Sequence, residues 1–467
     1  MIGSIVGAIS GFMYSKLLII MLLAVGLYFT VKCGLLQIRM FGESIRVVGE
    51  KPDKEGSVSS FQALMVSTAS RVGTGNIVGV ATAICMGGYG SVFWMWIIAF
   101  IGGASAFVES TLAQIYKRKR PDGSCYGGPS YYIEAALNSY PLGFIFAISM
   151  LLTYAGGFNM LCAYNLQSTF SAYSFYDPKI SPIIIGAILA LIFGYCLLGG
   201  DDRIVKTTST LVPFMGVLYV IVSLVVVVMH IGLLPGVFAR IFAEAFDFKA
   251  IFGGFSGSCM MYGIKRGLYS NEAGCGSAPN AAAAAVVSHP VKQGLVQMLS
   301  VFIDTLLLCT ATALMCLCSG VEPTAELAGA PYVQAALHAS LGPVGPIFIT
   351  VSMILFAFTT LIGNFYYMDN LLIYMHKGIP SEKFMFAFRI VGTVVVFIGA
   401  IMSMGLLWDI ADVLMGVMAI INLPVIVILH KVALGALKDY EEQKAAGKNP
   451  VFKAEKVGLQ GKVDFWN

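Results

Sequence analysis

Long apolar segments recur along almost the whole chain, and they restrict the fold more than any other feature. A helix that crosses a bilayer needs about 20 predominantly apolar residues. Segments of that kind lie at 15–35, 61–85, 91–116, 141–171, 181–198, 207–230, 247–268, 294–319, 344–375, 384–404 and 408–430. The alternating short segments typical of membrane strands are absent. The sequence therefore predicts an all-α polytopic membrane protein with about 11 transmembrane helices.

Composition supports this class and argues against several others. Of the 467 residues, 58% are hydrophobic and only 12% are charged. The ten cysteines and five histidines show neither zinc-ligand nor catalytic-triad spacing, so we expect no enzyme. The basic run at 117–120 is interpreted as a membrane-surface anchor rather than a site for nucleic acid. The apolar run at 17–31 lacks a cleavage pattern and is expected to be a retained helix.

Lys and Arg residues indicate the orientation in the membrane. If the N-terminus lies outside, the inside loops collect most of the basic residues between helices, together with those of the C-terminal tail. Cytoplasmic loops are the ones enriched in Lys and Arg. We therefore expect a multi-pass protein of the cell inner (plasma) membrane with its N-terminus outside and its C-terminus in the cytoplasm.

The segments after the first helix divide into two groups of five. We expect a peripheral N-terminal helix and cytoplasmic linker at 1–60, a first five-helix repeat at 61–230, a second at 245–432 and a cytoplasmic tail at 433–467. Because five is odd, the second repeat would be inverted relative to the first.

Each group begins with a helix interrupted by glycine. Gly73, Gly75 and Gly79 flank Asn76 in the first, and Gly253 to Ser258 interrupt the second. Paired interrupted helices at corresponding positions indicate a binding site near the membrane midplane of a transporter built from inverted repeats. The alternative is that these glycines form small-xxx-small faces for helix packing.

An opening at residues 74–76 would present both backbone amides and backbone carbonyls that have no helical hydrogen-bond partner. Amides at the start of the second half-helix favour an anion such as an amino-acid carboxylate. Carbonyls that end the first half, at Ala69 and Val72, favour a cation, and hydroxyls of Thr359 and Thr360 are suited to complete its shell. The alternative for the threonines is hydrogen bonding to carbonyls of their own helix.

Charged residues inside apolar segments form a second set of candidates. The run at 263–280 is either a gate, in which Lys265 or Arg266 pairs with Glu272, or a capped rigid loop. Asp304 has either a structural hydrogen-bonding role or a role as a proton relay. Arg71, one turn before the first interruption, is placed to pair with one of the intramembrane acids, which are Glu109, Asp304, Asp369, Asp409 and Asp412.

The combined motifs resemble those of the alanine or glycine:cation symporter family over nearly the whole chain. They are Gly73 to Ala81, Gly127 to Tyr132, Leu211 to Met215, Lys265 to Pro279, His289-Pro290 with Gln293-Gly294, Phe302 to Thr305, and Phe356 to Thr360. The resemblance implies the leucine-transporter-type 5+5 inverted-repeat fold plus one N-terminal helix. It also implies a sodium site made by carbonyls of Ala69, Val72 and Phe356 and hydroxyls of Thr359 and Thr360.

The sequence departs from the family pattern where side chains would select the substrate. Cys162 and Tyr164 lie where the family has Gln and Asn, Asn364 where a Trp is common, and Tyr262 where an amide is expected. The expected substrate-binding residues are Thr74, Gly75, Asn76, Cys162, Ser256, Gly257, Tyr262 and Asn364.

The resulting prediction is a symporter that couples Na⁺ to import of small neutral amino acids of the alanine and glycine class by alternating access. Two alternatives stay open within transport: a proton-coupled carrier of the same fold, and a carrier of a larger or more polar amino acid. A non-transporting membrane sensor is disfavoured because the tail after His430 is too short for a signalling domain.

Overall fold

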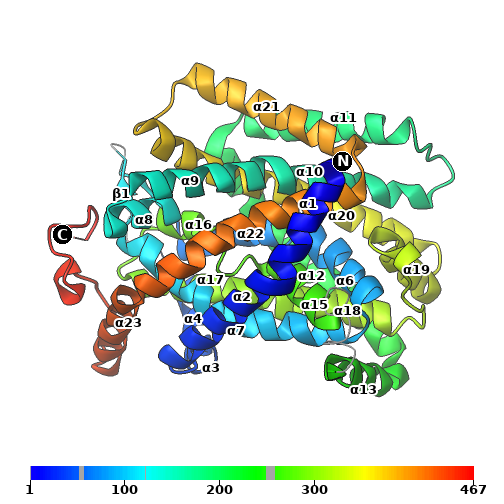
Figure 1. The fold of residues 1–467 in the computed structure, drawn as a ribbon, viewed down its shortest axis with the longest axis horizontal. Helices are drawn as coiled ribbons and strands as arrows, with labels where there is room; N and C mark the ends of the chain where they lie inside the picture. Colours follow the sequence, from blue (N-terminus) through cyan, green and yellow to red (C-terminus); the bar gives the residue numbers. More distant parts are fainter. Residues whose placement is uncertain (1, 52–56, 121–122, 249–257, 467) are drawn as a thin grey trace.

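The computed structural model describes residues 2–51, 57–120, 123–248 and 258–466, and these are largely helical (Figure 1). Eight helices in the described part are long and apolar enough to cross a membrane, and Gly75–Gly87 and Ser181–Leu197 are shorter apolar helices. A two-residue antiparallel ladder, β1 (Arg118–Lys119) with β2 (Cys125–Tyr126), is the one sheet in those ranges. The prediction of an all-α polytopic membrane protein is confirmed.

The N-terminal part is a long helix followed by two short ones. Its elements are α1 (Ile2–Phe12), η1 (Met13–Leu17), α2 (Leu18–Lys32), α3 (Leu36–Arg39) and α4 (Phe41–Val48). Figure 1 shows α1 and α2 lying along the outside of the bundle, across α22. Contacts of this helix with α22 and α7 make it a packed part of the fold.

The first half of the remaining chain contains five membrane-crossing units. Its elements are α5 (Ser60–Arg71), η2 (Gly75–Gly79), α6 (Val80–Gly87), α7 (Gly90–Ile115), α8 (Pro129–Leu137), α9 (Tyr140–Leu151), η3 (Leu152–Phe158), α10 (Asn159–Ser168), η4 (Thr169–Ala172), α11 (Ser181–Leu197) and α12 (Gly200–Met229). One unit is broken between α5 and η2. Another runs through α9, η3 and α10.

The second half contains the remaining helices of the chain. Its elements are η5 (Ile231–Leu233), α13 (Leu234–Ala245), α15 (Cys259–Asn271), α16 (Pro279–Ala284), α17 (Pro290–Val301), η7 (Phe302–Cys309), α18 (Thr310–Leu317), η8 (Ala325–Leu327), α19 (Ala330–Leu341), α20 (Val344–His376), α21 (Glu382–Ile401), α22 (Met404–Ile428), α23 (His430–Ala445) and η9 (Ala454–Val457). The boundaries of the two repeats remain a prediction.

Local chemistry explains where the first broken helix starts and stops. Ser59 and Gln62 form a reciprocal capping box that satisfies two free amides at the start of α5. At the other end, Val72 has φ −76° and ψ 88°, which is outside the helical range. Gly73 follows, and the Asn76 side chain accepts a hydrogen bond from its amide at 2.9 Å. This local bond replaces a lost helical one.

The second predicted interruption, at Gly253 to Ser258, lies almost wholly outside the described residues. Of the residues 253–258, only Ser258 belongs to the described part, and it is the N-cap of α15. The observed break is the non-helical segment 272–278 between α15 and α16. Gly274 and Gly276 there have φ of +83° and +84°, a conformation that disfavours residues with a Cβ. Among the described residues, the motif at 263–280 thus contains a helix break of its own.

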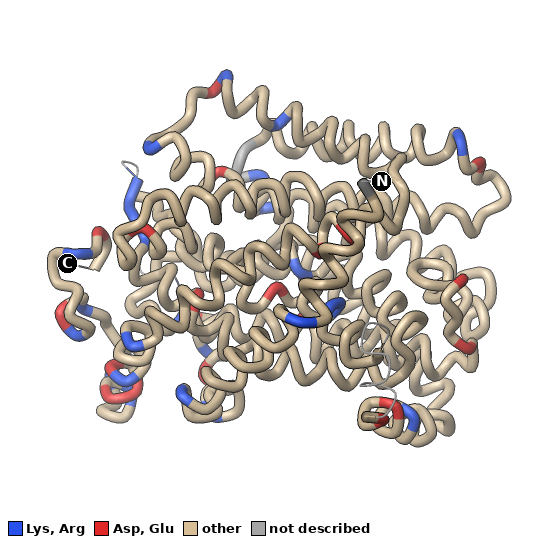
Figure 2. The backbone as a smooth tube through the Cα atoms, viewed as in Figure 1, with Lys and Arg blue, Asp and Glu red and all other residues tan. Residues whose placement is uncertain are grey.

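Exposed apolar side chains mark the membrane-facing side. They are concentrated on α11, α12 and α21, for example Leu191, Phe214 and Val391. In Figure 1, α11 and α21 lie side by side along one edge of the molecule. Figure 2 shows that many Lys, Arg, Asp and Glu residues lie toward the ends of the helices, while a smaller number lie in the middle.

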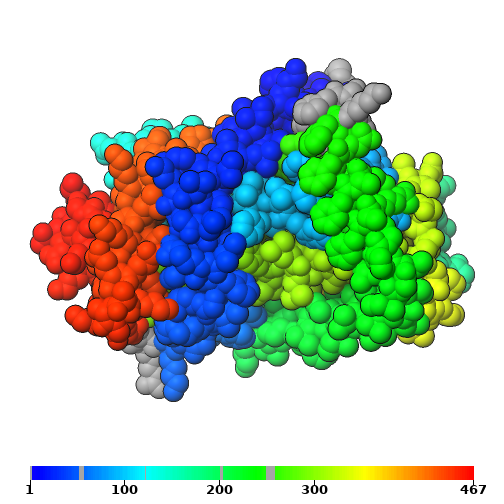
Figure 3. Space-filling model, turned by 90° about the horizontal axis from the view of Figure 1, so that it is seen from below, coloured from blue at the N-terminus to red at the C-terminus, as the bar shows by residue number. Residues whose placement is uncertain are grey.

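The last segment of the chain packs against the body of the protein. The Trp466 indole donates to the carbonyl of Gln114 at 2.7 Å, and the Phe452 amide donates to the carbonyl of Ser288 at 2.9 Å. Figure 3 shows the α23 region against the N-terminal segment on one face, with the final residues beyond it. The segment at 433–467, which we expected to be a tail, is therefore a structural part of this end of the molecule.

Candidate functional site

Thr360 joins α20 to the end of α5. Its hydroxyl donates a hydrogen bond to the carbonyl of Ala69 at 3.1 Å. A Cβ placed on Gly73 would lie 1.9 Å from the same hydroxyl oxygen, so only glycine fits there. Gly363, one turn further along α20, has the backbone of Ser70 2.8 Å from the position of a Cβ. The two helices thus make close backbone contact at the break.

Thr359 hydrogen-bonds within its own helix. Its hydroxyl lies 3.0 Å from the carbonyl of Leu355 and 3.1 Å from that of Phe356. The alternative interpretation, in which the threonines hydrogen-bond to carbonyls of their own helix, therefore applies to Thr359. Thr360 instead hydrogen-bonds to a carbonyl of another helix, α5. A hydroxyl that donates to a carbonyl keeps lone pairs that a cation can use.

The chemistry of this group fits a small hard cation. Ala69, Val72, Phe356 and Thr359 are fully buried, and Thr360 is 6% exposed. They offer carbonyl and hydroxyl oxygens from two helices, the ligand type that hard cations take. The carbonyl end of α5 also carries the negative end of a helix dipole. No cluster of His, Cys, Asp and Glu suited to a transition metal occurs in the described ranges.

Asn76 connects the first broken helix to Asp304 on η7. Its Nδ2 donates to Asp304 Oδ1 at 2.7 Å, while Ser270 and Thr305 donate to Oδ2 at 2.8 and 2.7 Å. Asp304 is fully buried. The carboxylate thus ties η2, α15 and η7 together, which matches the structural role weighed from sequence and leaves its proton chemistry untested.

Two residues that the sequence did not single out lie beside the opening at Thr74 and Gly75. The ring of Tyr269 would be 2.9 Å from a Cβ on Gly75, and Asn165 donates from Nδ2 to the Thr74 hydroxyl at 3.1 Å. The Oδ1 atom of Asn165 is buried and has no hydrogen-bond partner. A buried amide with an unused acceptor is a candidate substrate contact. The signal in the sequence was an Asn within an apolar helix.

Aromatic rings close the space around Tyr269. Its ring centroid lies 4.8 Å from those of both Phe158 and Trp408. Phe158 belongs to η3 and Trp408 to α22, so two different helices contribute rings that pack against Tyr269 beside the break.

The other predicted substrate residues are distributed over three places. Cys162 is buried on α10, with its thiol 3.4 Å from the carbonyl of Ala357. Tyr262 and Tyr269 both lie on α15. Tyr262 is next to Gly87, the last residue of α6, and Tyr269 is the one beside Gly75. Ser256 and Gly257 lie outside the described residues.

Asn364, also expected to contact substrate, belongs to a buried polar chain. It accepts from the Ser70 hydroxyl at 2.6 Å and donates to Asn159 Oδ1 at 2.9 Å. The same Ser70 hydroxyl lies 3.4 Å from Glu272 Oε1. This network runs from α5 to the second break.

The segment 272–278 is held by buried carboxylates. Glu109 on α7 accepts from the amides of Gly274 and Gly276 at 3.3 and 3.1 Å, and from Asn422 at 2.7 Å. Glu272 accepts from the Ser277 hydroxyl at 2.6 Å. Of the two readings of the 263–280 motif, this geometry fits the capped, rigid segment.

The ion pairs considered for a gate in that motif are absent from this conformation. Lys265 and Arg266 both pair with Asp412 of α22, at 2.8 and 2.9 Å, instead of with Glu272. The reason is geometric: Glu272 lies beyond the end of α15, with φ of 54°, and its side chain turns toward Ser277. Arg266 also lies over the ring of Trp408 at 3.8 Å.

Arg71 differs from the expectation as well. Its described hydrogen bond is from Nη1 to the carbonyl of Gln297 at 3.4 Å, and Nε and Nη2 have no partner. No carboxylate of the described residues lies within ion-pair distance of it. The gate pairing predicted for Arg71 is therefore not present in this conformation.

Comparison with known proteins identifies the group to which this arrangement belongs. The model of the sodium:alanine symporter family matches residues 1–454. The chain belongs to the sodium:alanine symporter family. Its relatives include the probable sodium/glutamine symporter GlnT of Bacillus subtilis, 44% identical over 99% of this chain and 95% of the relative. The sodium/alanine symporter AgcS of Methanococcus maripaludis is 37% identical over 96% and 99%.

Solved structures of distant transporters share the fold. A mutant manganese transporter of Eremococcus coleocola aligns with a TM-score of 0.54 at 13% identity, covering 89% of this chain and 84% of that one. A Na⁺-coupled sialic acid symporter in a substrate-bound outward-open state aligns with a TM-score of 0.50 at 11% identity, covering 98% and 96%. At such identities the likeness concerns the fold, which is of the leucine-transporter type. Members of the sodium:alanine symporter family named here are transporters.

Proposed function

We propose that this protein is a Na⁺-coupled symporter that imports neutral amino acids of the alanine and glycine class across the cell inner membrane, with its C-terminus in the cytoplasm. The observation that carries the proposal is the oxygen cluster at the end of α5. The carbonyl oxygen of Ala69 on α5 and the hydroxyl oxygen of Thr360 on α20 lie 3.1 Å apart, beside the opening at Thr74 to Asn76. Sodium there would stabilise the junction of α5 and α20.

The amino acid would bind next to that cluster. The positive end of the helix dipole at the start of η2 and α6 would favour its carboxylate. Asn165 Oδ1, which has no partner, would accept a hydrogen bond from the ligand. Because sodium and amino acid favour the same closed arrangement of the broken helix, each would strengthen binding of the other.

A larger amide-bearing amino acid is a second candidate, and one observation favours it. Asn165 and Thr74 form a polar pair beside Gly75, where a side-chain amide would find both a donor and an acceptor. The relative GlnT, 44% identical, is named a probable sodium/glutamine symporter. Cys162 lies on the same helix as Asn165 and offers a small side chain.

Proton coupling is the rival for the driving ion. The relative from Bacillus sp. strain PS3, 39% identical over 90% of this chain and 96% of that protein, is named a sodium/proton-dependent alanine carrier. Asp304 is the buried carboxylate beside Asn76, but Asn76, Ser270 and Thr305 already hydrogen-bond to its oxygens. These three contacts are accounted for by the structural role of Asp304, which ties η2, α15 and η7 together. Sodium therefore remains the proposed ion.

The test is uptake into liposomes that contain the purified protein. Labelled alanine, glycine, serine and glutamine would be offered with an inward sodium gradient or an equal potassium gradient. Alanine or glycine uptake with sodium alone supports the proposal. Preferential glutamine uptake supports the second candidate, and equal uptake in potassium with a dependence on a proton gradient contradicts sodium coupling.

A further inference from the structure

A basic cavity lies on the end of the molecule that carries the C-terminal segment. Its volume is about 510 Å³, and its walls come from the end of α4, the start of α17 and the turn after α23. A volume of this size is in the range of small-ligand sites. Its basic side chains are Arg46, Lys51, Lys292, Lys444 and Lys448.

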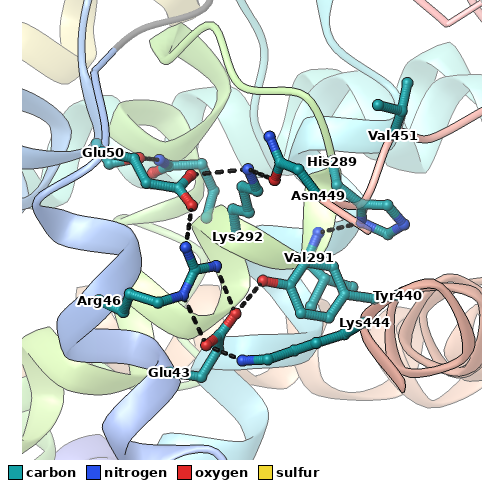
Figure 4. A network of polar contacts seen from close by, with 12 residues as sticks. Glu43, Arg46, Glu50, His289, Val291, Lys292, Tyr440, Lys444, Asn449 and Val451 are labelled. Atoms are coloured by element: carbon teal, nitrogen blue, oxygen red, sulfur yellow. Dashed lines mark hydrogen bonds and ion pairs between the residues drawn. The ribbon is translucent and has the colours of Figure 1, made fainter. Parts of the chain in front are cut away.

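Carboxylates neutralise only part of this charge. Glu50 lines the cavity, and Glu43 lies beside it (Figure 4). Arg46 spans the two acids, at 2.7 Å from Glu43 and 2.7 Å from Glu50. Lys444 pairs with Glu43, and Lys292 pairs with Glu50 at 2.7 Å. Three of the five cations therefore share these two anions.

The unpaired part of the charge is accessible. Lys51 and Lys448 are exposed and make no ion pair with a carboxylate of the described residues. Lys292, by contrast, is 2% exposed and fixed by Glu50 and by Asn449 at 2.9 Å. One buried, oriented ammonium group with flexible lysines around it is suited to a multiply oxygenated anion such as a phosphate.

The neighbouring side chains indicate where such an anion would come from. On α4, the same helix as Arg46, Phe41 and Ile45 are 41% and 54% exposed, and Ile38 just before it is 65% exposed. A short helix with apolar side chains outside and basic ones on another side lies in the interface plane of a membrane. Headgroup phosphates occupy that depth.

We propose that the cavity bounded by Arg46, Lys51, Lys292, Lys444 and Lys448 binds the phosphate headgroup of an anionic phospholipid. The headgroup phosphate lies among the five basic groups, and the acyl chains leave over Phe41 and Ile45. Bound there, it relieves the repulsion among the cations and ties α4 and the start of α17 to the C-terminal segment. Basic pockets on the cytoplasmic side of membrane proteins recognise lipid headgroups in this way.

The test measures thermal unfolding of the full-length protein in detergent by tryptophan fluorescence. Phosphatidylglycerol is titrated, with phosphatidylcholine as the neutral lipid. The double variant Lys51→Gln/Lys448→Gln removes two unpaired cations, and Lys456→Gln/Lys462→Gln removes the same charge from exposed positions of the C-terminal segment outside the cavity. Because unfolding is measured rather than uptake, the result is independent of the transported substrate.

The expected result is stabilisation by phosphatidylglycerol alone, with the half-saturating concentration raised about 30-fold in Lys51→Gln/Lys448→Gln and unchanged in the control pair. Equal responses of both double variants would overturn the site, as would equal stabilisation by phosphatidylcholine. A third arm adds inorganic phosphate or pyrophosphate without lipid. If these stabilise the protein as strongly as the lipid, the cavity binds free phosphate and the lipid source is wrong.

Discussion

The Thr360 hydroxyl donates a hydrogen bond to the Ala69 carbonyl at 3.1 Å, across the contact between α20 and the end of α5. The bond depends on Gly73, because any side chain there would meet the same hydroxyl. One residue pair thus links the interruption of a membrane helix to an oxygen cluster suited to sodium. The central proposal rests on this relationship.

Thr359→Ala/Thr360→Ala is expected to weaken sodium activation of uptake. Loss of two hydroxyl ligands raises the sodium concentration for half-maximal uptake by about tenfold or more, since 1.4 kcal/mol is tenfold in affinity. The measurement is initial uptake against sodium concentration. Thr393→Ala is the control, because Thr393 hydrogen-bonds within its own helix, α21. Unchanged sodium activation in the double variant would contradict the assigned site.

Asn165→Ala is expected to weaken binding of the transported amino acid. Loss of the amide removes a contact to the ligand and the bond to Thr74, so the KM of uptake rises by about tenfold, with sodium activation little changed. Gln167→Ala on the same helix is the control, since Gln167 hydrogen-bonds to Tyr176 instead. Equal KM values in the parent and Asn165→Ala would remove Asn165 from the substrate site.

Asp412→Asn is expected to destabilise the protein strongly. Asp412 is the common partner of Lys265 and Arg266, and its loss leaves two buried cations without an anion. Breaking a buried pair in this way costs about 3–5 kcal/mol. Thermal unfolding compares it with Asp409→Asn, a more exposed acid of the same helix. A similarly small shift of the unfolding temperature in both variants would show that the ion pairs of Asp412 with Lys265 and Arg266 contribute little to stability.

His289 is expected to make the protein less stable as the pH falls below about 6.5. Its Nδ1 accepts from the Val291 amide at 3.2 Å and its Nε2 lies 3.3 Å from Asp439. Burial, and secondarily Lys292, lowers the pKa of His289 to about 3. In the unfolded chain His289 has its ordinary pKa and binds a proton below about pH 6.5, whereas in the folded protein it stays neutral down to about pH 3. The contribution of His289 to the free energy of unfolding is therefore lost progressively as the pH falls from about 6.5 toward 3.

The measurement is the unfolding temperature at pH 7.5 and pH 5 for the parent, His289→Asn and His376→Gln. His289 contributes on the order of 1 kcal/mol per pH unit below its unfolded pKa. His289→Asn, which keeps an acceptor for the Val291 amide, should lose that part of the pH dependence, and His376→Gln should keep it. An identical pH response in all three proteins would refute the assignment.

The sequence predicted the helices and the first break because both depend on local composition. Apolar length defines a membrane helix, and Gly73 and Gly75 next to Asn76 mark an opening. It also indicated Ala69 and Thr360, although their contact spans 291 positions of the chain. That prediction came from the oxygen chemistry of the residues at the break, and the family resemblance supported it.

Side-chain partners at a distance were predicted less well. Pairing of Glu272 with Lys265 or Arg266 was one of the two interpretations of the motif at 263–280. Asp412 is their partner because α22 packs beside α15 and supplies the nearer carboxylate. Tyr269 lies next to Gly75, whereas Tyr262 of the same helix, α15, lies next to Gly87.

The most direct test of sodium coupling is concentrative uptake. Liposomes that contain the protein are given the amino acid preferred in the uptake panel at equal concentration on both sides, with sodium outside and potassium inside and the membrane potential clamped at zero. The account predicts accumulation above the outside concentration, which disappears when sodium is equal on both sides and is reduced in Thr359→Ala/Thr360→Ala. Accumulation that persists without a sodium gradient, or none with one, would contradict it.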